Sequence, residues 1–265
     1  MEGLKREISS DSISASLKLS KRNFNHQFLN FLTRNKLIKH FRVFVRKLLD
    51  LIDYSILLSN NGAIFYNDIE KTERVRKIKL IMKQTHILLR VCEAYSLVTL
   101  VEKTAKIEGD IAELGTYKGG SAKLICEAKK NKTLHIFDTF EGLPTLSKND
   151  DHGQFEQGKF TSSFDEVRSL LQAYPNVHLY KGLFPSTAGP ISDRYFSFVH
   201  LDADIYESTR EALFFFYSRL RNGGMILSHD YTSSPGVREA FDEFFADKSE
   251  HVIELSGSQC LVIKG

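Results

Sequence analysis

The sequence predicts an α/β domain built on a mainly parallel sheet and preceded by a helical N-terminal region. From Glu108 onward, short apolar runs alternate with longer amphipathic segments, which is the pattern of β-α units around a parallel sheet. The last two runs, HVIELSG and QCLVIKG, are joined by a tight turn and so form an antiparallel pair. Together the runs predict a seven-stranded sheet with an antiparallel terminal hairpin.

Residues 1–106 are predicted to be helical after a flexible start. The first 22 residues are Ser-rich and contain no apolar signal core, which predicts a flexible segment over 1–22 and argues against secretion. From Asn23 to about Leu58, apolar residues recur at helical intervals. After a turn over NNGAIFYND, the segment from Glu73 to Ile107 continues as helix. We expect region 23–106 to cover the substrate or to form a subunit interface, and its apolar content favours a homodimer.

The charge of the chain is uneven. Residues 1–106 hold 20 Lys and Arg against 10 Asp and Glu, a net +10, whereas residues 107–265 hold 16 against 23, a net −7. The basic half either meets an anionic partner, such as lipid, nucleic acid or an acidic carrier protein, or is solvated or packed against the acidic half. We favour the second interpretation and expect no nucleic-acid partner. Three irregularly spaced cysteines and the lack of an apolar run of about 20 residues predict a cytoplasmic protein without a transmembrane segment.

The region after Glu108 contains seven strand candidates and four helix candidates. The helix PGVREAFDEFFAD places Val237, Ala240, Phe241, Phe244 and Phe245 on one apolar stripe, which predicts burial against the sheet. The stretch SKNDDHGQFEQGKF is interpreted as a mobile lid followed by a helix, in which Asp150, Asp151 and His152 are expected to be solvated rather than to contact the substrate. The strand candidates are DIAELG, TLHIFDTF, VHLYKG, FSFVHLDAD, GGMILSHD, HVIELSG and QCLVIKG, and the other helix candidates are SAKLICEAKKN, FDEVRSLLQAY and STREALFFFYSRLRN.

Polar residues follow four of the predicted strands. In open parallel sheets a ligand binds outside the carboxyl ends of the strands, where the strand order reverses, so these residues mark the predicted site. They are Glu113 and Gly115 after the first strand, Asp138 after the second, Asp202 and Asp204 after the fourth, and His229 and Asp230 after the fifth.

The first strand leads into a glycine-rich loop, AELGTYKGGSA. Gly115 permits a turn with unusual backbone angles, and Gly119 with Gly120 permits close approach of a ligand at the start of the next helix, whose N-terminus favours an anion. No G-K-[ST] follows Lys118, which argues against a phosphate-binding P-loop. Asp138 lies where an acid commonly binds ribose hydroxyls. A ligand with a ribose, a carboxylate and no essential phosphate, such as S-adenosylmethionine, suits this loop; the alternative is a tight structural turn.

The stretch HLDADIYEST places two carboxylates two residues apart. Side chains at i and i+2 of a strand point to the same side, so Asp202 and Asp204 face one volume, an arrangement that favours a shared cation or proton. The structural alternative is that these acids cap the helix that follows, but Ser208 fits that role better. His200, inside the strand, is interpreted as a packed residue.

Several motifs in this order resemble the macrocin O-methyltransferase family, also called the TylF type. They are GDIAELGTYKGGSAKLI, HIFDTFEGLP, KGLFPSTAG, HLDADIYESTREAL and GGMILSHDYTSSPGVREAFDEFF. The resemblance covers most of residues 107–265 and implies a Rossmann-like class I methyltransferase domain. It also implies an S-adenosylmethionine-dependent O-methyltransferase that acts on a sugar hydroxyl of a natural product.

The resemblance implies site residues by matching positions. Asp204 matches the residue proposed as general base, and Asp202 matches a magnesium ligand. Where family members often have Asp-Asp-Tyr after the fifth strand, this chain has His229, Asp230 and Tyr231, so Asp230 keeps its carboxylate and His229 replaces one. The implied cofactor-binding residues are Glu113, Gly115, Tyr117, Gly119, Ser121, Asp138, Thr139 and Phe140, with Glu141 lining the same cleft.

Two cofactors are implied, S-adenosylmethionine and a divalent metal. Mg²⁺ prefers hard oxygen ligands, so His229 leaves manganese, iron or zinc as alternatives to it. An unperturbed Asp has a pKa of about 3.9 and is too weak a base for an unactivated alcohol. A metal on the substrate oxygens would lower the pKa of the hydroxyl, and Asp204 would then take its proton.

Two other functions stay open at this point. A metal-dependent glycosyltransferase also uses an Asp-x-Asp pair at a strand end, although the glycine loop and Asp138 already form a nucleoside site. A non-catalytic module with a methyltransferase-like fold is the second, and His229 is the feature that favours it. The expected partner is a small-molecule or glycan hydroxyl acceptor, either a sugar hydroxyl or a non-sugar alcohol or phenol.

Overall fold

The computed structural model describes residues 55–59, 62–66 and 69–265. The predictions of a flexible start and of amphipathic helices up to residue 54 lie outside the described residues. The chain divides into two compact units, Met1–Thr72 and Glu73–Gly265. The second unit therefore includes helices that precede Ile107, the position where the charge of the sequence changes.

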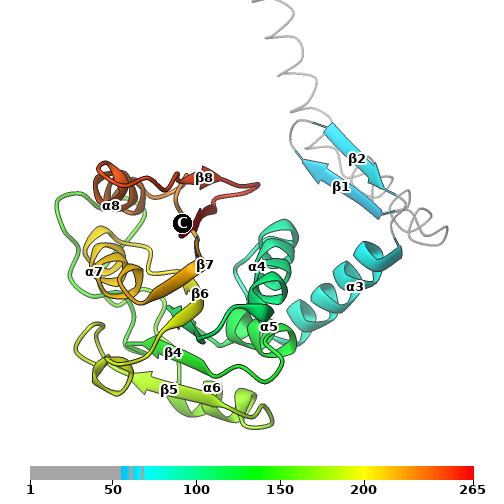
Figure 1. Ribbon diagram of the computed structural model, residues 1–265, viewed down its shortest axis with the longest axis horizontal. Coiled ribbons are helices and arrows are strands. Elements are labelled where there is room, and N and C mark those ends of the chain that lie inside the picture. The colour runs from blue at the N-terminus through cyan, green and yellow to red at the C-terminus, as the bar shows by residue number, and fades with distance from the viewer. Residues whose placement is uncertain (1–54, 60–61, 67–68) are drawn as a thin grey trace, which may run out of the picture. The chain divides into compact units, whose positions relative to one another are not determined.

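In the first unit, the described residues form a β-hairpin and the first turn of helix α3 (Ile69–Gln84). Strand β1 (Ser55–Ser59) pairs antiparallel with β2 (Gly62–Tyr66), with Ser55 opposite Tyr66 (Figure 1). Two predictions are wrong here. Ser55–Ser59 is a strand, although a helix was expected up to about Leu58, and Gly62–Tyr66 is a strand, although a turn was expected there. Both segments carry β-branched or aromatic residues, which favour strands, and the hairpin satisfies the backbone groups of both at once.

The second unit is built on a seven-stranded sheet with the order β5-β4-β3-β6-β7-β9-β8. The pairs from β5 to β7 are parallel, and β9 is antiparallel to both of its neighbours. This confirms the mainly parallel sheet with an antiparallel terminal hairpin; the hairpin turns back inside the sheet, so that β8 is the edge strand. The strands are β3 (Asp110–Leu114), β4 (Leu134–Asp138), β5 (Val177–Lys181), β6 (Phe196–Leu201), β7 (Leu220–Ser228), β8 (Ile253–Glu254) and β9 (Cys260–Ile263).

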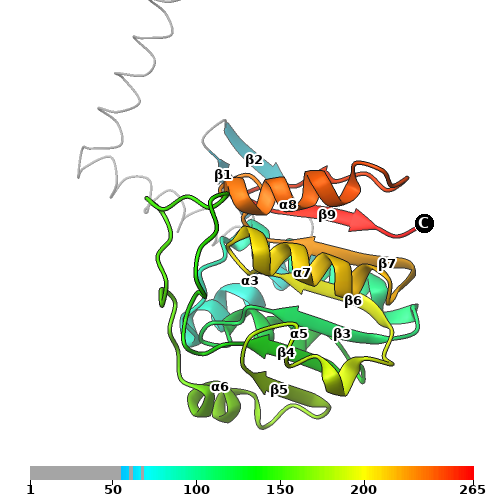
Figure 2. The ribbon, with the colours of Figure 1, turned by 90° about the vertical axis from the view of Figure 1, so that its left-hand side faces the viewer.

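Helices cover both faces of this sheet. On one face, α7 (Tyr206–Tyr217) and α8 (Pro235–Phe245) lie side by side (Figure 2), and their buried residues join one core cluster. On the other face, α4 (Val91–Lys103), α5 (Gly120–Ala128) and α6 (Phe164–Leu171) contribute to a second cluster. The predicted stripe of α8 is confirmed, because all five of its residues are buried.

The helix predicted from Glu73 to Ile107 is interrupted. Helix α3 (Ile69–Gln84) stops, α4 begins at Val91, and a 3₁₀ turn, η1 (Thr104–Lys106), follows it. The break passes against α5, since a Cβ at Gly120 would lie 2.7 Å from the carbonyl oxygen of His86. Helix α4 restarts where the Glu93 carboxylate accepts the backbone N–H of Arg90 at 2.6 Å. Hydrophobic periodicity continues across the break, which is why the pattern predicted one helix.

The strand order reverses between β3 and β6, which are neighbours in the sheet and are its first and fourth strands along the chain. A ligand site is expected at the carboxyl ends of these strands. None of the helices within residues 69–265 has the length and hydropathy that a membrane span requires.

Candidate active site

A cavity of about 290 Å³ opens at the carboxyl ends of the central strands. Loops after β3, β4, β5, β6 and β7 all contribute to its walls, as the sheet order predicts. Its acidic and imidazole side chains are Asp138, Asp202, Asp204, His229, Asp230 and His86. The cavity therefore joins the glycine loop and the acid-rich strand ends in one space.

Most of the predicted site residues line this cavity. From the glycine loop and β4 these are Gly115, Tyr117, Ser121, Asp138 and Thr139, and from β6 and β7 they are Asp202, Asp204, His229 and Asp230.

Three residues predicted to bind the cofactor are not among the residues that line it. Glu113 is fully buried, and its Oε1 lies 3.0 Å from Nδ1 of His200, which is itself fully buried, as predicted. Gly119 is the residue before α5, with φ 78°, and faces Val167 and Leu170. Phe140 is 2% exposed and packs edge-to-face on Phe164. All three pack on the side of the glycine loop or of β3 that faces away from the cavity. Alternation along β3 directs Glu113 away, and packing against α6 directs Gly119 and Phe140 away.

Asp138 fastens the glycine loop to β4. Its Oδ2 accepts the backbone N–H groups of Thr116 and Tyr117, both at 2.9 Å, and its Oδ1 accepts that of Phe140 at 2.7 Å. Burial raises the pKa of Asp138, and the three N–H donors partly oppose this shift. The carboxylate thus has a loop-shaping role that its position in the sequence did not reveal.

Gly115 brings the two halves of the site together. Its φ is 81°, and a Cβ built there would lie 1.9 Å from the carbonyl oxygen of Asp202. Only a residue without a side chain permits this approach of the β3 loop to the end of β6. The left-handed angles of Tyr117, Asp204 and Asp230 at the same strand ends mark a site held in strained backbone conformations.

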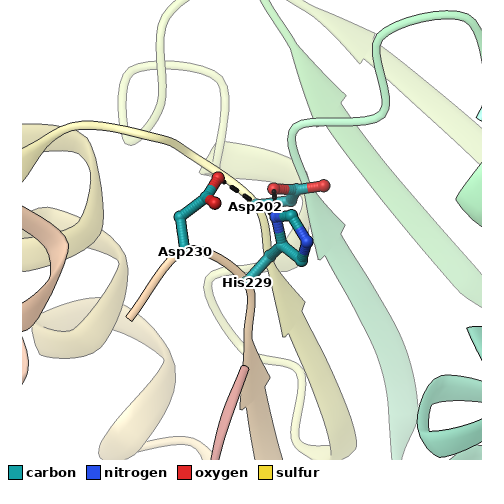
Figure 3. Close-up of side chains that lie close together, drawn as sticks. All are labelled: Asp202, His229 and Asp230. Atoms are coloured by element: carbon teal, nitrogen blue, oxygen red, sulfur yellow. Dashed lines mark ion pairs between the residues drawn. The ribbon is translucent and has the colours of Figure 1, made fainter. Parts of the chain in front are cut away.

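Asp202, His229 and Asp230 converge at the ends of β6 and β7. Figure 3 shows the two carboxylates on the same side of the imidazole, with His229 Nδ1 lying 3.2 Å from Asp202 Oδ1 and 3.0 Å from Asp230 Oδ2. Neither imidazole nitrogen is aligned for a hydrogen bond. One ligand atom from each residue lies within 4.8 Å of the others, a spacing that allows all three to bind one cation. Burial lowers the pKa of His229, but Asp202, Asp230 and Glu93 raise it far above its ordinary value.

Asp204 lines the cavity with Asp202, but both residues follow the end of β6 at Leu201, so the strand alternation expected to align them does not apply. Burial and the neighbouring carboxylates of Asp202 and Asp230 raise the pKa of Asp204 well above the ordinary value. The pKa of Asp230, by contrast, is lowered: burial acts to raise it, but His229 outweighs that effect. Two neighbouring carboxyls with opposite pKa shifts are typical of a pair that shares a proton.

Glu93 is a site residue that the sequence interpretation missed. It lies on α4, is 1% exposed, and places Oε2 3.4 Å from Nε2 of His229. Burial acts to raise its pKa, but His229 and the backbone N–H groups of Arg90 and Ser258 lower it to about 2. The one signal in the sequence was an acid in the first turn of a helix, and it was hidden because that helix start was not predicted.

Two loops also contribute lining residues that were not predicted. His86, Ile87, Leu88 and Leu89 come from the break between α3 and α4. The stretch interpreted as a lid supplies Gln154, Phe155, Lys159 and Phe160, and Phe155 is buried against Leu143 and Ile205. Asp150, Asp151 and His152 are not among the lining residues, but Asp150 is buried rather than solvated.

A model of the family described as macrocin-O-methyltransferase (TylF) matches residues 90–254. The chain belongs to this family. In this macrocin-O-methyltransferase family member, the match begins at α4 and includes every element that carries a lining acid or His229.

Two curated relatives are O-methyltransferases. The demethyldecarbamoylnovobiocin O-methyltransferase of Streptomyces niveus is 25% identical over 155 residues, 53% of this chain and 59% of that protein. The 8-demethyl-8-(2,3-dimethoxy-alpha-L-rhamnosyl)-tetracenomycin-C 4'-O-methyltransferase of Streptomyces olivaceus is 28% identical over 141 residues, 47% of this chain and 54% of that protein. This chain therefore spans just over half the length of either relative.

A solved structure of the O-methyltransferase NovP has the same fold. The two structures superpose with a TM-score of 0.60 at 23% identity, over 68% of this chain and 82% of NovP. The similarity confirms the Rossmann-like class I methyltransferase fold for this family member.

Proposed function

We propose that this chain is an S-adenosylmethionine-dependent O-methyltransferase that uses a divalent cation and acts on a hydroxyl of a sugar or glycosylated small molecule. The observation that carries the proposal is the contact of Gly115 with the end of β6, which joins a nucleoside-type loop and an acid cluster in one cavity. The names of the two curated relatives, one acting on a novobiocin and one on a rhamnosyl tetracenomycin, support a glycosylated acceptor.

The cofactor half consists of the glycine loop, the start of α5 and Asp138. Three of the roughly four acceptor positions of the Asp138 carboxylate are used by backbone N–H groups, so one position on Oδ1 remains for a ribose hydroxyl. The N-terminus of α5, with Gly120 and Ser121 on the cavity wall, suits the carboxylate of the cofactor. Thr139 donates its hydroxyl to the carbonyl of Gly142 at 2.7 Å and so shapes the loop after β4.

The residues of the acid cluster fit a divalent cation. Asp202 and Asp230 supply carboxylate oxygens, and Nδ1 of His229 faces both of them without an aligned hydrogen bond. A cation at their centre would give all three atoms a partner. When bound, S-adenosylmethionine supplies the methyl group and the cation lowers the pKa of the acceptor hydroxyl.

Asp204 is the proposed general base. Asp204 lines the cavity together with Asp202, one of the proposed metal ligands, so an acceptor hydroxyl held by the cluster would lie near it. Burial raises the pKa of Asp204 and so strengthens it as a proton acceptor, whereas a cation on Asp202 and Asp230 would offset the further increase from those two carboxylates and leave Asp204 ionised.

Residues before Ile107 contribute to the proposed substrate cover. Leu88 is 64% exposed, yet it lines the cavity, as do its neighbours Ile87 and Leu89. An apolar rim of this kind suits the non-sugar part of a glycoside. The homodimer expected from the sequence stays part of the proposal, and light scattering of the full chain tests it.

Calorimetry tests the cofactor proposal. S-adenosylmethionine is titrated into the wild type, with and without EDTA, and into Asp138→Asn, which keeps the shape of the side chain but removes its charge. We expect binding that survives EDTA and weakens by about tenfold in the variant, which is the loss of about 1.4 kcal/mol.

Glu141→Gln is the matched control. Glu141 was expected to line the cleft, but it is not among the residues that line the cavity, and its side chain is 77% exposed and pairs with Lys181. This variant should bind the cofactor like the wild type. Binding of a nucleotide sugar in place of S-adenosylmethionine would instead support the glycosyltransferase alternative and reject the proposal.

A further inference from the structure

The Glu93 carboxylate accepts three hydrogen bonds and lies beside the imidazole of His229. Oε1 accepts from the backbone N–H of Ser258 at 3.0 Å and from its hydroxyl at 3.2 Å. Oε2 accepts from the backbone N–H of Arg90 at 2.6 Å and lies 3.4 Å from Nε2 of His229. An ionised carboxylate is an acceptor only, so the His229 tautomer with its N–H on Nε2 suits this contact better than the tautomer with a lone pair there.

This preference determines what the other imidazole nitrogen does. With the proton on Nε2, a neutral His229 turns the lone pair of Nδ1 toward Asp202 Oδ1 and Asp230 Oδ2, at 3.2 and 3.0 Å. Because Nδ1 faces two carboxylate oxygens, positive charge is needed there: either a second proton on the imidazole or a cation that takes the place of that proton. A carboxylate behind a metal-binding imidazole is a recurrent arrangement that fixes the tautomer and raises the basicity of the ligand.

We infer that Glu93 is a positioning residue that fixes His229 with Nδ1 toward the cation, so that the site takes a first-row transition ion such as Mn²⁺ in preference to Mg²⁺. This inference rests on the proposed function, because it assumes the cation site. Imidazole suits transition ions, whereas Mg²⁺ favours an all-oxygen set. Glu93 lies on helix α4, whereas the three proposed ligands follow strands β6 and β7.

Metal affinity tests the inference. MnCl₂ is titrated into the protein in the presence of S-adenosylmethionine, free Mn²⁺ is followed by electron paramagnetic resonance, and MgCl₂ is added as a competitor. We expect the wild type to prefer Mn²⁺ over Mg²⁺. Because partners of metal ligands are typically worth about 10–100-fold in affinity, Glu93→Gln should weaken Mn²⁺ binding by about that factor.

A second substitution separates positioning from folding. In His229→Asp the imidazole is absent, so the preference should shift toward Mg²⁺, and adding Glu93→Gln should change Mn²⁺ affinity by less than about threefold. Ser258→Ala removes one donor to Glu93 without touching His229, and it should leave Mn²⁺ affinity unchanged. An equal loss from Glu93→Gln in both backgrounds would show that Glu93 acts through the fold, and it would overturn the inference.

Nitrogen-15 NMR of histidine-labelled wild type provides a readout that does not depend on the variants. With diamagnetic Zn²⁺, we expect His229 to carry its proton on Nε2 and to bind the ion through Nδ1. Metal on Nε2 would overturn the inference, as would Mn²⁺ affinity that is insensitive to Glu93→Gln. Cofactor binding in EDTA is measured on the same samples. Its absence rejects the proposed function, whereas its presence with an unchanged metal affinity rejects only the role of Glu93.

Discussion

Asp204 shows how one residue can be set for a task by its surroundings. Its φ of 63° lies in the left-handed region, and its backbone carbonyl accepts the hydroxyl of Ser234 at 2.9 Å. A strained backbone held by a specific partner is typical of functional positions. The cost of this conformation is of the order of 1–3 kcal/mol, which the packing of the surrounding elements must offset.

Asp204→Asn should abolish proton abstraction without disturbing cofactor binding. The amide cannot accept a proton, so methyl transfer should fall by about 10²–10⁴-fold, the usual contribution of a general base. The measurement is methyl transfer from labelled S-adenosylmethionine to a rhamnosyl glycoside found in a mass-spectrometric acceptor screen. Calorimetry on the same variant should give the wild-type cofactor affinity. A variant with full activity would remove Asp204 from the mechanism.

At the scale of elements, the approach of the β3 loop to β6 is the contact on which the site depends. Gly115→Ala should be severely destabilised, because it combines a left-handed φ with a Cβ 1.9 Å from the Asp202 carbonyl oxygen. The conformational part alone costs about 1–2 kcal/mol, and the backbone shift adds to it. Urea unfolding should report a loss of at least this size, together with weaker binding of S-adenosylmethionine.

Gly189→Ala is the matched control for that substitution. No atom lies within 4 Å of a Cβ built at Gly189, and its φ is not in the left-handed region. Its free energy of unfolding should stay within about 0.5 kcal/mol of the wild type. Equal effects from the two alanines would contradict the close approach.

Helix α7 offers a second test at this scale. Phe216 is fully buried among the rings of Phe184 and Phe196, with centroid distances of 5.2 and 5.1 Å, whereas Phe214 on the same helix is 56% exposed. Phe216→Ala should lower the free energy of unfolding by about 3–5 kcal/mol. Phe214→Ala, which loses its contact with Phe244, should cost less than half as much. The comparison is made by urea unfolding, and reversed sizes would contradict the helix orientation.

At the scale of the whole molecule, thiol reactivity reports on cooperative unfolding. Burial raises the pKa of Cys126 to about 12, and it raises that of Cys260 further. Both thiols should therefore stay unmodified by iodoacetamide at pH 8 in the native protein, because the thiolate is the reactive form. Mass spectrometry of the native and urea-unfolded protein checks this. Rapid labelling of either residue in the native state would contradict the packing of α5 or β9.

Much of the site was predictable because it lies on a regular pattern. The alternation of strands and helices predicted the sheet, the sheet predicted that acids at strand ends share a site, and nine of the predicted residues do line one cavity. Glu113 and Phe140 lie beside the site, as expected, but their side chains do not line the cavity. The direction of each side chain depends on which face of the strand or loop is buried. That choice involves neighbours such as His200 and Phe164, which are distant in sequence.

The family, the parallel sheet and the residues that follow its strands were predictable, because they depend on local periodicity and short motifs. Three features follow only from the three-dimensional arrangement: α4 begins at Val91, Glu93 meets His229, and Gly115 contacts Asp202. The effect of a buried carboxylate or of a missing Cβ depends on the neighbour that it meets. Glu93 and His229 are 136 positions apart in the chain but 3.4 Å apart in space.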